Sequence, residues 1–157
     1  MKKLFLAAIM ICFSYLASAQ EISKNTIGIR LGDSDGFGTE VSYQRALGQN
    51  NRLEAGLGWR NSKDYDAFKL SGIYQWVWSI DNNFNWYAGA GGGLASWKHD
   101  SADIDGTGIF VAGDIGIEYN FDFPLLISLD IRPELGFNDD YNDDLDMDMA
   151  IGVRYQF

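Results

Sequence analysis

Residues 145–157 read LDMDMAIGVRYQF, and apolar side chains alternate there with polar or small ones along the whole stretch. The apolar positions are Leu145, Met147, Met149, Ile151, Val153, Tyr155 and Phe157. Successive side chains of a β-strand point to opposite faces, so this stretch is expected to form a strand with one apolar and one polar face.

The same alternation divides the chain from residue 25 onward into eight predicted strands, at 25–32, 38–47, 51–60, 66–78, 84–97, 107–121, 124–137 and 144–157. The 18 glycines, two prolines and 15% aromatic residues suit many short strands separated by turns. No segment of useful length shows a helical period. The sequence therefore predicts an all-β fold, an eight-stranded antiparallel up-and-down β-barrel.

Side-chain size decides which face of this barrel points inward. A soluble barrel turns its apolar face inward, whereas a membrane barrel turns it toward lipid and keeps a polar lumen. The interior of an eight-stranded barrel is just wide enough to be filled by side chains. The polar face carries small residues at Gly28, Ser42, Gly56, Gly58, Ser71, Gly89, Gly91, Gly116 and Gly152. We therefore expect a transmembrane barrel. A soluble lipocalin-like barrel is the alternative.

The large aromatic residues of the apolar face gather near the predicted strand ends. An aromatic girdle is expected from Trp59, Phe68, Trp76, Trp78, Trp86, Tyr119, Phe121, Tyr155 and Phe157. With the N-terminus on the periplasmic side, Trp59 and Phe68 lie at the outer rim with Phe137, and the others lie at the periplasmic rim. Two such girdles around an aliphatic band are typical of membrane interfaces.

The polar face carries charges of both signs. The predicted lumen charge network is Arg30, Glu40, Glu54, Arg60, Lys69, Asp114, Glu118, Asp130, Arg132, Glu134, Asp146, Asp148 and Arg154. Buried charges must be paired and hydrogen-bonded, so these residues predict a salt-bridged plug. Eight acids against five bases leave a narrow cation-selective channel open as the alternative.

The predicted connections alternate in length along the chain. Short turns are expected at 48–50, 81–83 and 122–123, and longer outer loops at 32–38, 61–65, 98–106 and 138–143. The outer loops are acidic, with aspartates at Asp33, Asp35, Asp64, Asp66, Asp100, Asp103, Asp105, Asp139, Asp140, Asp143 and Asp144.

Two places fit the pattern less well. Trp97 falls on the lumen face by parity from Trp86, unless a β-bulge between Gly89 and Gly93 resets the alternation. Pro133 cannot donate a ladder hydrogen bond and predicts a local irregularity in its strand.

Residues 1–19 are predicted to be a cleaved signal peptide, which leaves residues 20–157 as the barrel domain. Lys2 and Lys3 precede an apolar run at 4–13, and small residues at 17–19 form the cleavage motif. The single cysteine, Cys12, leaves with this segment, which excludes disulfides and cysteine-based metal sites. Loss of Lys2 and Lys3 takes the formal charge from −10 to −12. So acidic a chain is not expected to bind nucleic acid.

Three stretches resemble the small bacterial outer-membrane β-barrel proteins, in the size class of OmpX and the OmpA transmembrane domain, and the porin-like "outer membrane protein beta-barrel" domain. They are the signal motif at 17–19 and the segments 129–133 and 153–157. The resemblance implies a Gram-negative outer membrane, with membrane lipid and lipopolysaccharide as partners. It also implies that Val153, Tyr155 and Phe157 form a C-terminal signal read by the barrel-assembly machinery during insertion.

No catalytic, cofactor or metal site is predicted. Some barrels of this architecture modify lipid A with a Ser/His/acid set, and His99 has Ser96, Asp100 and Ser101 nearby, but adjacent residues rarely converge on one reacting atom. The run at 103–106 resembles part of a calcium loop but lacks the distal glutamate. The sequence predicts a monomeric barrel with a structural or surface-interaction role. The alternatives are the narrow channel and a lipid A-modifying enzyme.

Overall fold

The computed structural model describes residues 22–32, 38–62, 65–99, 104–137 and 145–157; at 60–62, 65, 99 and 104–105 it describes the backbone alone. The predicted signal peptide at 1–19 lies outside this part of the chain. The same holds for the predicted loop aspartates at 33, 35, 64, 100, 103, 139, 140, 143 and 144.

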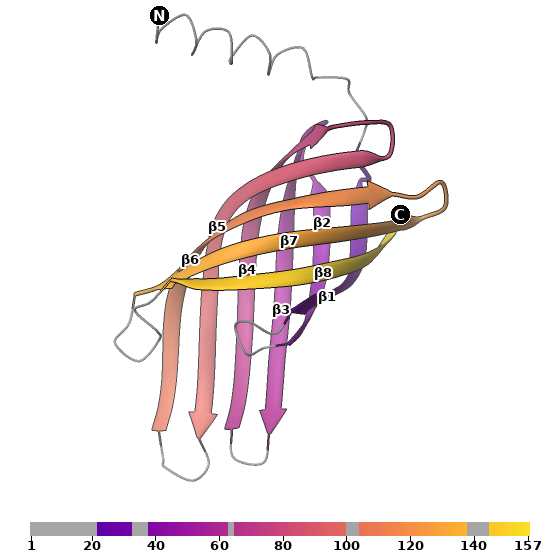
Figure 1. Cartoon of the computed structure of the whole chain (residues 1–157). Coiled ribbons are helices and arrows are strands. Elements are labelled where there is room, and N and C mark those ends of the chain that lie inside the picture. The colour runs from indigo at the N-terminus through magenta and orange to yellow at the C-terminus, as the bar shows by residue number, and fades with distance from the viewer. Residues whose placement is uncertain (1–21, 33–37, 63–64, 100–103, 138–144) are drawn as a thin grey trace, which may run out of the picture.

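Eight strands form one closed antiparallel barrel in which each strand pairs with its neighbours in sequence and β1 pairs with β8 (Figure 1). The strands are β1 Asn25–Gly32, β2 Thr39–Ala46, β3 Asn51–Ser62, β4 Tyr65–Ser79, β5 Phe84–His99, β6 Ile104–Asn120, β7 Leu125–Gly136 and β8 Asp146–Gln156. The predicted fold class, an eight-stranded up-and-down barrel, is confirmed.

The barrel wall is apolar on the outside and polar on the inside. On β8, Met149 and Ile151 are 55% and 51% exposed, whereas Asp148 between the outward-facing Met147 and Met149 is 1% exposed. Outward aliphatic side chains follow one another through Cα register partners, from Ile29 to Val41, Leu57, Leu70 and Leu94 across β1–β5. A protein that folded in water alone would bury these side chains, so the barrel is inside out relative to a soluble one.

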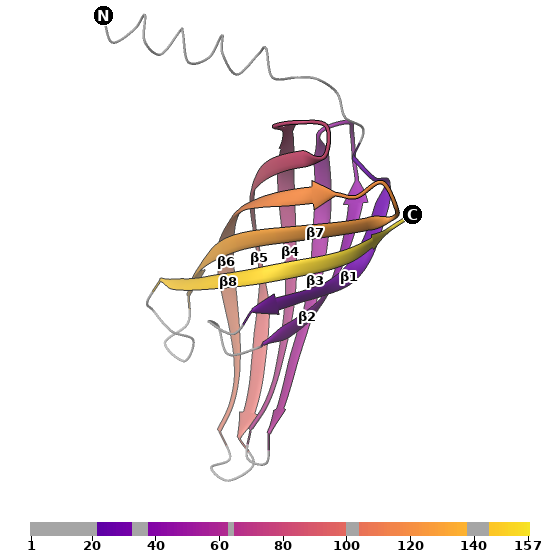
Figure 2. The ribbon, with the colours of Figure 1, turned by 45° about the vertical axis from the view of Figure 1, so that its right-hand side comes forward.

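Strands β3–β6, with 12, 15, 16 and 17 residues, are longer than β1, β2 and β8, which have 8, 8 and 11, and β4–β6 are also longer than β7, which has 12. Figures 1 and 2 show the ends of these four strands reaching past β1, β2 and β8 at the bottom of both views. We call this part, residues 59–62, 65–68, 96–99 and 104–107, the four-strand extension. On its two sides the pairing to β2 stops at Gly58 and the pairing to β7 stops at Phe110.

The predicted alternation of short turns and long loops is wrong in its strict form. At one end of the barrel, the turn end, the connections 47–50, 80–83 and 121–124 have the same length. At the opposite end, the loop end, only residues 63–64 separate β3 from β4, and 100–103 separate β5 from β6. Several residues that were predicted to lie in loops belong to strands β3–β6, because backbone pairing continues into the extension.

The two predicted irregularities have different outcomes. The β4–β5 register runs unbroken from Asp66 and Lys98 to Ser79 and Asn85, so the expected bulge at Gly89–Gly93 is wrong and parity alone places Trp97 on the lumen face. The irregularity at Pro133 is confirmed. The β6–β7 partners stop at Ala112 and Glu134 and resume in the same register at Ile115 and Ile131.

Glycines on the lumen face of β5 and β6 make room for the aromatic side chains opposite them. Tyr87 lies over its register partner Gly116, and the Phe110 ring lies over Gly93. Near the loop end the Trp97 indole lies over Gly106 in the same way. Such cross-strand cover of a glycine by an aromatic ring compensates for the missing side chain and fixes the register.

Replacing Gly116 by alanine is expected to lower the free energy of unfolding by about 1–3 kcal/mol. The new Cβ would lie 2.5 Å from the Tyr87 ring and 2.8 Å from the carbonyl oxygen of Leu129. Gly72→Ala is the control, because a Cβ there meets nothing within 4 Å. Alanine at 72 should be neutral or stabilise by up to about 1 kcal/mol. Equal urea midpoints for the two variants would contradict this role of Gly116.

Candidate functional site

The lumen is the main concentration of buried charge in the described part of the chain. Five cations and seven carboxylates lie there, each less than 5% exposed: Arg30, Arg52, Lys69, Arg132, Arg154, Glu40, Glu54, Asp114, Glu118, Asp130, Glu134 and Asp148. Two other residues of the predicted network differ. Asp146 is only half-buried and accepts a hydrogen bond from the backbone of Met147, and the side chain of Arg60 lies outside the described ones.

Arg132 occupies the middle of this network. Its Nη2 lies 3.0 Å from Glu54 Oε1 and 3.4 Å from Asp114 Oδ2. Its Nη1 lies 3.7 Å from Glu40 Oε2. The guanidinium therefore contacts carboxylates from β2 and β3 across the lumen and one from the neighbouring strand β6.

Arg30 and Lys69 bind the carboxylates nearer the loop end. Arg30 Nε and Nη2 donate to Asp130 Oδ1 at 2.8 and 2.6 Å, and Nη1 pairs with Asp148. Lys69 Nζ donates to both oxygens of Glu134, at 2.7 and 2.9 Å, and lies 5.2 Å from the centre of the Phe110 ring. Charge-assisted hydrogen bonds of this kind are the strong ones in a poorly hydrated interior.

Glu40 has cations on three sides but no direct hydrogen bond. Arg30 Nη1, Lys69 Nζ and Arg132 Nη1 lie 3.8, 3.6 and 3.7 Å from its carboxylate. Both oxygens are buried without a hydrogen-bond partner in the structure. Charge attraction alone therefore holds this side chain between β1, β4 and β7.

The turn-end half of the lumen contains Arg154 and Arg52. Arg154 donates to Ser42 at 2.9 Å and Ser128 at 2.7 Å, and Nη2 lies 3.3 Å from Glu54. Arg52 lies 2.8 Å from Glu118 and donates to Gln75 at 2.6 Å.

Arg52 was absent from the predicted network. The signal was present in the sequence, because Arg52 lies two positions before Glu54 and shares its face of the strand.

Apolar and aromatic side chains complete the filling of the lumen, which the predicted network also lacked. Ile73, Phe110 and Ala112 form a buried cluster, and Tyr87 is fully buried with its hydroxyl 3.2 Å from Asp130. Phe110 and Tyr87 are among the largest fully buried side chains of the chain. The lumen is thus filled by a mixed plug of ion pairs and rings.

The predicted girdle residues lie on the outer surface at the two ends of the apolar wall. Trp59 and Phe68 are register partners at the base of the four-strand extension. At the turn end the rings contact one another: Trp78 stacks on Trp86 at 4.3 Å, and Tyr119 meets Phe121 at 4.7 Å. Trp76, Tyr155 and Phe157 are exposed at the same end. Phe84 and Phe123, which the prediction omitted, join this group through Tyr119 and Phe121.

Of the remaining candidates, Ser96 has a described side chain, whereas Asp100 and Ser101 lie outside the described residues. Ser96 donates to the carbonyl of Gly106 at 3.3 Å on the outer face, while the side chain of His99 lies outside the described ones. Among the described residues, no three His, Cys, Asp or Glu side chains are placed to hold a metal ion. The same part of the chain has no helix that is long and apolar enough to cross a membrane.

The closed barrel is similar in fold to small outer-membrane β-barrels. The N-terminal barrel domain of Pseudomonas aeruginosa OprF superposes with a TM-score of 0.66 at 12% identity, over 85% of this chain and 95% of that domain. Neisserial surface protein A gives 0.62 at 12% identity, over 85% and 94%. Ail, the attachment invasion locus protein of Yersinia pestis, gives 0.56 at 17% identity, over 86% and 97%. No family model and no curated protein matches the sequence.

Replacing Arg132 by methionine is expected to destabilise the barrel by about 3–5 kcal/mol, because it leaves buried carboxylates without their cation. Arg45→Met is the control, since Arg45 is exposed on the outer face of β2. It should leave the unfolding free energy nearly unchanged. Equilibrium unfolding in urea, with the protein folded in detergent micelles, measures both. Similar small effects for the two variants would mean that the lumen charges are solvated rather than paired.

Proposed function

We propose that the chain is an integral outer-membrane barrel whose role is structural or surface-interacting, without transport or catalysis. One observation carries the proposal: the wall exposes an aliphatic band between two aromatic groups, while ion pairs fill the inside. Lipid is the solvent in which this arrangement is stable, because a closed barrel satisfies all backbone groups and its apolar side chains face acyl chains. The similarity to OprF, NspA and Ail supports the same location.

The position of the aromatic residues gives the barrel an orientation in the membrane. Rings collect at interfaces, so Trp59 and Phe68 mark one membrane boundary and the turn-end group marks the other. The turn end then faces the periplasm, because all three of its connections are four residues long, whereas the loop end also has the longer connections 33–38 and 137–145. The four-strand extension then stands outside the cell.

The four-strand extension is the part of the described surface best suited to interaction with other molecules. From the level of Phe68 onward its outer face carries exposed polar side chains: Ser96 and Thr107 are in register with Phe68, and Asp66 and Lys98 lie beyond it. A rigid scaffold that holds such a surface clear of the membrane is a common way to present binding groups. Ail was also solved with a heparin analogue, sucrose octasulfate. Polyanions are not proposed as ligands here, because this chain has a formal charge of −10.

The filled lumen argues against the channel alternative. A path for ions would have to pass Arg132, Tyr87 and Phe110, each at most 1% exposed. We further propose that the protein is a monomer, that lipopolysaccharide surrounds its outer half, and that the barrel-assembly machinery inserts it through Val153, Tyr155 and Phe157. Cofactors, nucleic acid and lipid A chemistry have no place in this proposal.

The proposed membrane location predicts that the protein remains in the membrane fraction until detergent is added. It also predicts heat modifiability. The folded barrel should migrate differently on a gel before and after boiling, because a closed ladder resists detergent until it is heated. Recovery of the protein in the soluble periplasmic fraction would contradict the proposal and favour a lipocalin-like barrel.

The plug predicts that the purified barrel produces no stepwise ion conductance in planar bilayers. Successful insertion is checked independently by the gel shift of protein recovered from liposomes of the same lipid. Reproducible unitary currents from inserted wild-type protein would instead establish the channel alternative.

A further inference from the structure

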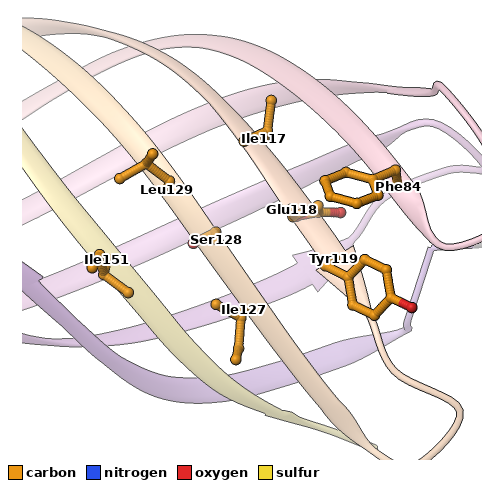
Figure 3. Close-up of a pocket in the computed structure, with 8 residues that line it drawn as sticks. All are labelled: Phe84, Ile117, Glu118, Tyr119, Ile127, Ser128, Leu129 and Ile151. Atoms are coloured by element: carbon orange, nitrogen blue, oxygen red, sulfur yellow. The ribbon is translucent and has the colours of Figure 1, made fainter.

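The described part of the outer wall includes an apolar furrow along β6 and β7. Its turn-end part lies between β6 and β7, with Ile117 and Tyr119 on one side and Ile127 and Leu129 on the other (Figure 3). Phe84 and Ile151 close its edges, and its volume is about 250 Å³. Glu118 and Ser128 also line it, but their side chains bind Arg52 and Arg154 inside the barrel. They therefore contribute backbone to the floor.

A second hollow continues the first along the same two strands. Ile117 and Leu129 line both, Trp86 lies beside its register partner Ile117, and Ile115, Ile131 and Met149 extend the lining away from the turn end. Together they form what we call the β6–β7 furrow. From Ile127 to Ile131 it is about 13 Å long, at the usual rise of an antiparallel strand.

We infer that the β6–β7 furrow holds one acyl chain of a phospholipid from the periplasmic leaflet. This inference rests on the proposed membrane location. Along the furrow the lining is aliphatic and aromatic, and its polar side-chain groups on the outer face are the Tyr119 hydroxyl and the Trp86 indole. An occupant with its own hydrogen-bonding groups would lose them to an apolar site, whereas an alkyl chain has none to lose.

The ends of the furrow indicate how the lipid would lie. Tyr119 is at the turn end within the aromatic group, where the proposed orientation places the lipid headgroups and where a phenol has a polar neighbour. The chain then extends past Leu129 toward Ile131, in the direction of the membrane midplane. Lipopolysaccharide is not the source, because it occupies the leaflet at the other end of the barrel.

The walls of the furrow are fixed before any lipid binds. Trp86 stacks on Trp78 at 4.3 Å, and Phe84 meets Tyr119 edge to face at 5.1 Å. A groove with rigid walls binds a flexible chain at a lower ordering cost than a groove that must form around it. A second copy of the barrel fits less well, because close approach in lipid needs small residues and this furrow is bordered by large ones.

Native mass spectrometry of the detergent-purified barrel with added dipalmitoyl phosphatidylethanolamine tests the inference. Wild-type protein should retain one lipid. Leu129→Trp fills the space between the two sides of the furrow and should weaken retention about tenfold, the loss expected when contact with about two methylene groups disappears. Leu70→Trp is the matched control, because Leu70 and Leu129 are both 45% exposed on the outer wall. It should retain the lipid as wild type does.

Three outcomes overturn the inference: no retained lipid on the wild type, equal loss in both variants, or full retention by Leu129→Trp. In each case a normal heat-induced gel shift shows that the proposed membrane barrel itself stands. If Leu129→Trp does not assemble, Ile117→Phe narrows the furrow from its β6 side and is judged by the same criterion. A wild type that needs no detergent would instead overturn the proposed function.

Discussion

The width of an eight-stranded barrel governs the rest of this structure. Its lumen admits side chains and little else, so each charge that points inward must find its partner among the other seven strands. Arg132 illustrates the consequence, because its guanidinium reaches Glu54 from β3 and Asp114 from β6. A pairing of this kind constrains the relative position of three strands at once. The plug is therefore part of what defines the closed barrel, as well as what blocks it.

The same narrow interior explains the glycines. Large side chains such as Tyr87, Phe110 and Trp97 fit into the lumen only where the neighbouring strand has a glycine. Their register partners are Gly116, Gly93 and Gly106. A large side chain on one strand is thus balanced by a glycine on the neighbouring strand. Outside the barrel no such limit applies, and bulky residues such as Trp76 and Met149 stand exposed.

Period-two alternation was enough to predict the barrel, its eight strands and the face that points outward, since all three depend on parity and side-chain size. The same alternation also predicts the position of Trp97 on the lumen face, so no bulge at Gly89–Gly93 is needed to explain it. Arg52 could have been found by the same rule. The ion-pair partners could not be predicted, because the hydrogen bonds from Lys69 to Glu134, 65 positions further along the sequence, depend on the curvature and stagger of β4 and β7. The predicted loop lengths were wrong for a related reason, since polar residues at strand ends do not reveal whether the backbone remains paired.

The aromatic–glycine pairing of the lumen face continues along β5 and β6 into the four-strand extension. The aromatic–glycine pairs on β5 and β6 begin with Tyr87 near the turn end, continue at Phe110, and reach Trp97 within the extension. Each pair fixes the register of this hairpin, and the last one does so where β1, β2 and β8 have already ended. The same aromatic–glycine pairing that fills the lumen therefore also holds β5 and β6 in register within the extension. A surface carried on such strands needs no loop of its own to be held in position, which is consistent with the short connections at 63–64 and 100–103.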